Sequence, residues 1–120
     1  CRSFEKAGVD IAFHTDFPVS SRISTSQQFY CAVKRANPQK GPKSVKNPDE
    51  GIDPIRSLQA STANIAYMFN AFNEIGSFSI GKIANCTIFN IDFLDCNADD
   101  VNKAKLIATI IEGNEVYRAK

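Results

Sequence analysis

The sequence has few of the residues that build a self-contained metal or redox centre. Its 120 residues include one histidine, no tryptophan and four cysteines, and no two cysteines form a CxxC pair. Zinc fingers and thioredoxin-type sites need closely spaced Cys or His ligands, so the sequence excludes both classes. Widely separated cysteines in apolar surroundings favour free thiols in a cytoplasmic protein over two disulfides. The four are Cys1, Cys31, Cys86 and Cys96.

Strong net charge and long apolar runs are also absent. There are 14 basic and 13 acidic residues, so the net charge of +1 gives no field that would attract nucleic acid or an anionic membrane. The longest unbroken run of apolar residues and Thr, Leu106–Ile111, is far shorter than the roughly 20 residues of a membrane helix. Lysines make residues 37–51 locally basic, but no aromatic residue is interleaved there for base stacking. We therefore predict neither a nucleic-acid nor a membrane partner.

An apolar run near the start of the chain ends abruptly in polar residues. Residues 9–13 read Val-Asp-Ile-Ala-Phe, and His14, Thr15 and Asp16 follow. A nearly continuous apolar run is typical of a parallel strand that is covered on both faces. Residues 2–7 before it read as a helix that closes on Gly8. The order of helix, glycine, buried strand and polar cluster predicts one α/β unit.

The rest of the chain reads as two helices followed by short strands. Helices are predicted over residues 26–35 and over residues 53–72, the second bent near Ser61 and Thr62, with an exposed connection between them. Strands are predicted within residues 76–82, over 86–91 and over 105–111, and Gly113-Asn114 is a hairpin-turn signal. A short helical turn is expected at residues 98–102.

Two separated blocks of sequence resemble the amidohydrolase superfamily. Residues 8–18, with Ala32-Val33-Lys34-Arg35 after them, are similar to the last barrel strand and the segment that follows it, where Gly-Ser-Asp-x-Pro is the commoner motif. Residues 62–66 and 75–85 resemble the passage from the last helix into the C-terminal β-domain of that superfamily. The terminal hairpin, residues 106–117, fits the same pattern. Within the superfamily, the chain resembles the branch that includes N-substituted formamide deformylase.

This resemblance implies an α/β fold that is part of a larger one. Residues 1–74 would form the C-terminal end of a TIM-type catalytic barrel, comprising the last strand, an exposed loop and two helices. Residues 75–120 would form the C-terminal part of a small β-sandwich. A whole barrel takes about 250 residues, so we expect the chain to be a C-terminal fragment whose partner is the remainder of its own barrel and sandwich.

The resemblance also implies a function for the parent enzyme, namely metal-dependent hydrolysis of non-peptide C–N bonds in small amide-like substrates. Asp16 would take a proton from metal-activated water and pass it to the leaving nitrogen, and Asp16 is also a candidate metal ligand. The implied cofactor is a divalent metal, with zinc as the expected ion. Because the other ligands of the family are missing from the sequence, the isolated chain is expected to be inactive and metal-free.

The motif around Asp16 departs from the family pattern. His14-Thr15 replaces the usual Gly-Ser, which puts a bulky, titratable ring beside the site. We interpret His14 and Thr15 as residues that shape the substrate pocket or support Asp16, and we prefer this role to metal ligation for His14. Asn85 stands where an Asp is usual and is expected to affect a structural hydrogen bond.

A second hypothesis belongs to another class of protein. The chain would be a free-standing, non-catalytic binding or oligomerisation module, because strands without a neighbour leave edges that can pair with another copy. A homo-oligomer or a strand-exchanged dimer would then form. The gene upstream of Cys1 distinguishes the hypotheses, since a His-x-His motif after an apolar strand supports the enzyme and a nearby start codon supports the module.

Overall fold

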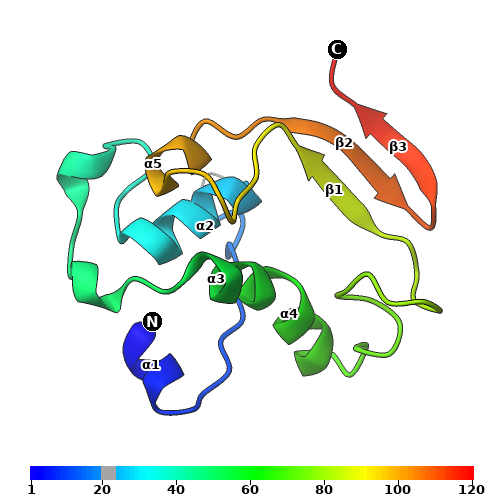
Figure 1. Ribbon diagram of the computed structural model, residues 1–120, viewed down its shortest axis with the longest axis horizontal. Coiled ribbons are helices and arrows are strands. Elements are labelled where there is room, and N and C mark those ends of the chain that lie inside the picture. Colours follow the sequence, from blue (N-terminus) through cyan, green and yellow to red (C-terminus); the bar gives the residue numbers. More distant parts are fainter. Residues whose placement is uncertain (20–23) are drawn as a thin grey trace.

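The computed structural model describes residues 1–19 and 24–120, in which short helices and one small sheet lie in different parts of the molecule (Figure 1). The order of elements is α1 (Arg2–Lys6), α2 (Thr25–Lys34), the 3-10 helices η1 (Pro42–Ser44) and η2 (Pro48–Glu50), α3 (Pro54–Ser61), α4 (Ala63–Met68), β1 (Cys86–Phe89), α5 (Ala98–Val101), β2 (Leu106–Ile111) and β3 (Asn114–Arg118).

The strand predicted for residues 9–13 is wrong, because this segment is extended but joins no sheet within residues 1–19 and 24–120. A strand needs a row of backbone partners on a neighbouring strand. The segment instead reaches two helices: the Phe13 N–H donates to the Ala60 carbonyl at 3.0 Å, and the Asn64 side chain donates to the Ile11 carbonyl at 2.8 Å. Ala60 lies in the last turn of α3, where carbonyl groups lack a partner within the helix.

Helix α2 agrees with its prediction to within one residue. Ser24 precedes it in an extended conformation, and Arg35 ends it in the left-handed conformation with φ of 56°. Apolar spacing predicts Phe29, Ala32 and Val33 on one side of this helix. Phe29 and Ala32 are buried together with Tyr30, and Val33 packs partly buried against them.

The second predicted helix is broken into α3 and α4. The Asp53 side chain caps α3 by accepting a hydrogen bond from the Ile55 N–H at 2.9 Å, and Pro54 is the first helical residue. Thr62 interrupts the helix with φ of −135° and ψ of −86°, which confirms the predicted bend. The helix ends before residue 72, because Asn70 adopts a positive φ of 55° just after α4.

The main core forms between α2 and residues from the C-terminal half of the chain. Phe29, Tyr30, Ala36 and Val101 are at least 96 % covered, and Phe93 packs its ring 5.0 Å from that of Phe29. Val101 belongs to α5, which lies beside α2 (Figure 1). The short helical turn predicted near residue 98 is therefore confirmed and closes the core.

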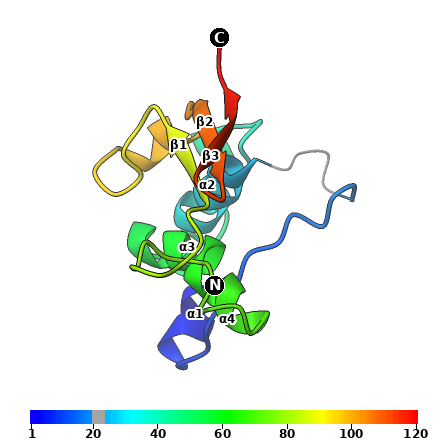
Figure 2. The ribbon, with the colours of Figure 1, turned by 90° about the vertical axis from the view of Figure 1, so that its right-hand side faces the viewer.

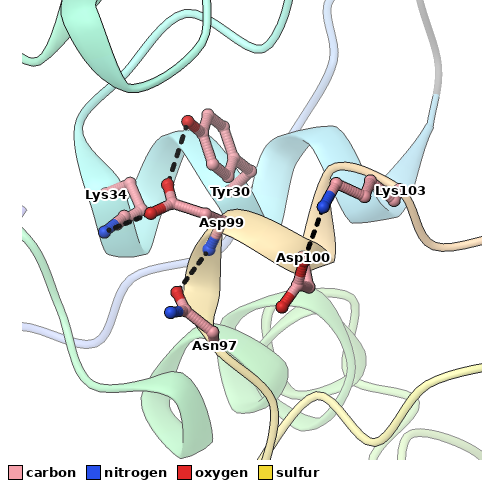
Figure 3. Close-up of polar contacts among 6 residues, drawn as sticks. All are labelled: Tyr30, Lys34, Asn97, Asp99, Asp100 and Lys103. Atoms are coloured by element: carbon pink, nitrogen blue, oxygen red, sulfur yellow. Dashed lines mark hydrogen bonds and ion pairs between the residues drawn. The ribbon is translucent and has the colours of Figure 1, made fainter.

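Polar contacts join α5 to α2 (Figure 3). Asp99 receives a hydrogen bond from the Tyr30 hydroxyl at 3.4 Å and pairs with the Lys34 ammonium group at 3.1 Å. The Asp99 backbone N–H donates to the Asn97 side chain at 3.0 Å, which caps α5. One carboxylate thus fixes the short helix to the long one.

The three strands form an antiparallel sheet in the order β1-β2-β3. The predicted hairpin is present, but its turn lies one residue earlier, because Glu112 and Gly113 have φ of 52° and 79° and a two-residue turn of this kind needs positive φ at both central positions. Asn85 accepts a hydrogen bond from the Glu112 N–H at 2.8 Å. Its predicted structural role is confirmed.

The strand predicted within residues 76–82 is wrong. Turns and bends replace it, and Gly76 and Gly81 have positive φ values of 89° and 93° that interrupt an extended strand. Phe78 is 87 % exposed and Ile80 is fully exposed, so neither side chain packs on the sheet.

The chain is a mixed α/β structure with free thiols. Its four cysteines form no disulfide in the described residues, as the sequence predicts. Among residues 1–19 and 24–120, every helix is too short or too polar to span a bilayer.

Candidate functional site

The three predicted site residues, His14, Thr15 and Asp16, lie together at the end of the extended segment. The segment is anchored to α3 and α4 by the bonds of Phe13 and Ile11 described above. Asn64 provides one of these anchors, and the sequence predicts no role for it. The available signal is an Asn inside a predicted helix, where it is unfavourable unless its side chain makes a specific hydrogen bond.

Asp16 adopts an unusual backbone conformation. Its φ is 55°, a left-handed value that Asp tolerates better than most residues. The Val19 N–H donates to the Asp16 carbonyl at 2.7 Å, which closes a turn, and the peptide bond between Phe17 and Pro18 is cis. The Asp16 carboxylate is 81 % exposed, so it faces outward from the described residues.

The ring of His14 contacts Asp16 in two ways. Its Nδ1 accepts a hydrogen bond from the Asp16 backbone N–H at 2.9 Å and lies 3.3 Å from the carboxylate oxygen Oδ1. One ring nitrogen cannot accept and donate at once, so Nδ1 accepts from the amide when it carries no proton and donates to the carboxylate when it carries one. In either state, His14 orients Asp16. Thr15 lies between them, and its hydroxyl accepts from the Phe17 N–H at 3.4 Å.

The described residues do not form a complete metal site. Nowhere in residues 1–19 and 24–120 are three His, Cys, Asp or Glu side chains arranged so that they could hold a metal ion. Asp16 and His14 supply one carboxylate and one imidazole, whereas a catalytic zinc ion takes three protein ligands. The metal expected from the sequence resemblance stays a prediction.

A cavity of about 400 Å³ opens beside this segment. Phe13, His14 and Thr15 line one side, and α2 contributes Cys31 and, at its C-terminal end, Arg35. In the sequence, Arg35 belongs to the block that resembles the amidohydrolase superfamily, and no binding role is predicted for it. The structure places it in the left-handed position that usually takes Gly or Asn, with its buried Nε lacking a hydrogen-bond partner among the described residues.

Two partly buried thiols are poor candidates for a nucleophile. Burial raises the pKa of Cys31, and nearby Arg35 opposes this only in part. Burial also raises the pKa of Cys96, and the neighbouring carboxylates of Asp100, Asp92 and Asp95 add to it. A raised pKa leaves little thiolate at neutral pH, so neither side chain is activated for covalent catalysis.

Comparison with known proteins gives the class of this chain. The structure superposes on an amidohydrolase from Thermotoga maritima MSB8 with a TM-score of 0.73 at 24 % identity. The superposition covers 98 % of this chain and 25 % of the other, so the two share a fold. Residues 1–117 match the amidohydrolase family, and the chain belongs to that family. The resemblance inferred from the sequence is confirmed.

Relatives of known name support the same family. The chain is 28 % identical over 112 residues to N-substituted formamide deformylase of Arthrobacter pascens, covering 93 % of this chain and 20 % of that protein. It is 31 % identical over 70 residues to an adenine deaminase of Clostridium botulinum, covering 58 % of this chain and 10 % of that protein. The chain thus spans a fifth or less of these relatives.

Proposed function

We propose that the protein containing this chain is a metal-dependent hydrolase of non-peptide C–N bonds in small amide-like substrates. The observation that carries the proposal is the position of Asp16 in a chain of the amidohydrolase family: an exposed carboxylate at the end of an anchored segment, in contact with His14. The names of the two relatives, a formamide deformylase and an adenine deaminase, both denote cleavage at a carbon–nitrogen bond.

In the proposed reaction, Asp16 takes a proton from water as the water attacks the substrate carbon. The same carboxyl group then gives the proton to the leaving nitrogen, so one residue acts as general base and general acid. His14 Nδ1 accepts a hydrogen bond from the Asp16 backbone N–H and so holds this backbone in place. Thr15 forms part of the wall of the neighbouring cavity. A divalent ion, zinc as first candidate, would lower the pKa of the water, with further ligands from outside this chain.

The first prediction concerns Asp16→Asn in the whole protein. The amide cannot carry the proton, so we expect kcat/KM to fall at least about 100-fold, the range of general acid–base catalysis. Elemental analysis should accompany the kinetics, so that loss of metal is separated from loss of proton transfer. Asp10→Asn is the matched control, because Asp10 is an exposed carboxylate on the same segment. Near-normal turnover of Asp16→Asn would contradict the assignment.

We further propose that residues 1–74 complete the barrel and that residues 75–120 complete a β-sandwich in the whole protein. The sheet lies entirely within residues 75–120, which supports this division, and α5 of the same part packs against α2. The proposed partners are the remainder of the barrel and sandwich and a small amide-like substrate. Cytoplasm is the proposed compartment, since free cysteines are typical of reducing surroundings.

A non-catalytic binding or oligomerisation module is the second candidate, and the outer strands favour it. All five residues of β3 are exposed, and β3 forms an edge of the sheet. Unpaired edges are templates for another chain. The isolated 120-residue chain is therefore expected to form homo-oligomers or strand-exchanged dimers, without activity or stoichiometric zinc.

Sedimentation velocity at rising concentration, with elemental analysis of the same sample, tests this second prediction. Val116→Lys should weaken the association, since Val116 is a 57 % exposed residue of β3 and a charge on an edge strand opposes pairing. A compact monomer at all concentrations, or one metal ion per chain, would count against these expectations.

A further inference from the structure

Among the described residues that line the cavity beside His14 and Thr15, one has a permanently charged side chain. Arg35 supplies a guanidinium group, and none of the lining side chains in the described residues is an Asp or a Glu. The volume of about 400 Å³ suits a small ligand. The cavity is therefore biased toward an anion.

Arg35 also has unused hydrogen-bonding capacity. Its Nε is buried, with no hydrogen-bond partner among the described residues. Nε has almost no accessible surface, so a ligand in the cavity would bind the terminal N–H groups of the guanidinium. The planar guanidinium matches a carboxylate in particular, since two parallel N–H groups can meet two oxygens.

We propose that this cavity binds a carboxylate group of the substrate and that Arg35 anchors this carboxylate. That the ligand is a substrate rests on the proposed function. The substrate would then be an amide that bears a carboxylate group. Gln27 and Gln28 also line the cavity from α2 and offer neutral donors and acceptors for the rest of the molecule.

The arrangement also fixes the direction of the ligand. His14 lies on the rim, 80 % exposed, and holds the backbone of Asp16 through a 2.9 Å hydrogen bond. A ligand carboxylate is attracted to Arg35 and repelled by the Asp16 carboxylate. The reactive amide would therefore point to Asp16 and the carboxylate to Arg35.

Calorimetric titration of the whole protein tests the proposal without requiring turnover. The probes are N-acetylglycine, which carries a carboxylate, and N-acetylglycinamide, its neutral counterpart. We expect the anion to bind about tenfold more tightly or better, the value of a charge-assisted hydrogen bond. Arg35→Gln should abolish this preference. Arg118→Gln, on the distant strand β3, should keep it.

Equal affinity for the two probes, no binding of either, or an unchanged preference in Arg35→Gln would overturn the proposal. Arg35→Gly is a second variant, because glycine suits the φ of 56° at this position and is expected to preserve the melting temperature. A folded Arg35→Gly protein that retains the preference would also overturn it. If both variants unfold, the preference of the unchanged protein decides.

The outcome separates this inference from the proposed function. If the anion preference depends on Arg35 while Asp16→Asn keeps normal turnover, the cavity assignment stands and the proton-shuttle assignment fails. If Asp16→Asn is inactive and the two probes bind equally, the proton shuttle stands and the carboxylate subsite fails.

Discussion

The helical part of the chain and its sheet differ in how much apolar surface they cover. Phe29 and Tyr30 in α2 are 1 % exposed, and Val101 in α5 is fully buried. Among the strand residues only Ala108 is buried, and Val116 in β3 is 57 % exposed. Figure 2 shows β3 and the C-terminal end far from α1 and α4.

This difference indicates which part of the chain stabilises the candidate site. The extended segment that ends at Asp16 is fastened to α3 and α4, which belong to the helical part. One contact between the sheet and the core is made by Phe89, whose ring centroid lies 5.0 Å from that of Phe93. A small sheet without a covered face is only marginally stable by itself. We therefore expect the site to respond to changes in the helical core far more than to changes in exposed apolar residues.

The largest effect is expected for Phe29→Ala. The side chain is buried against Phe93, so its removal leaves a cavity and should lower the free energy of unfolding by about 3–5 kcal/mol. Phe78→Ala is the matched control, because Phe78 is 87 % exposed and its loss should change the free energy by no more than about 0.5 kcal/mol. Denaturant unfolding of the 120-residue chain measures both. Similar losses in the two variants would show that the comparison is wrong.

A smaller effect is expected where the helical part passes into the sheet. A Cβ at Gly76 would lie 2.6 Å from the Ala66 Cβ, and φ at Gly76 is +89°, so Gly76→Ala should cost about 2–4 kcal/mol. Gly81 has φ of +93° but open space around it, and Gly81→Ala should cost about 1 kcal/mol. The difference in unfolding free energy isolates the packing on α4. Equal losses would mean that this loop is not held against the helix.

The sequence predicts the elements whose causes are local. Asp53 and Pro54 mark the start of α3, and Thr62 marks its break, because capping and side-chain hydrogen bonds act within a turn. The extended residues 9–13 were assigned to a strand because an apolar run has the same composition whether it pairs with a strand or crosses helices. Only the tertiary neighbours distinguish these cases.

The sequence predicts only the part of the candidate site that lies within one short segment. His14, Thr15 and Asp16 are consecutive, so a motif finds them together. Arg35 lies far along the chain, and its role depends on how residues 13–15 pack against α2 and on the sign of φ at the helix end. Neither property can be read from the neighbouring residues, so the cavity appears only in three dimensions.

The smallest predicted effect is a dependence of stability on alkaline pH. Burial raises the pKa of Tyr30 above its usual 10.0, and the charge of Asp99 and its hydrogen bond to the phenol add to this, whereas Lys34 opposes it. As pH rises, the Tyr30 phenol therefore ionises in the unfolded chain before it ionises in the folded chain. The stability that neutral Tyr30 contributes is complete below about pH 10 and is lost as pH rises toward the folded-state pKa. Tyr30→Phe should reduce this loss, and Tyr117→Phe in exposed β3 is the control. The free energy of unfolding of each variant and of the wild type is measured between pH 8 and about pH 11, a range that includes the ordinary pKa of a phenol. Identical pH profiles for Tyr30→Phe and the wild type would show that the phenol is not buried in the helical core.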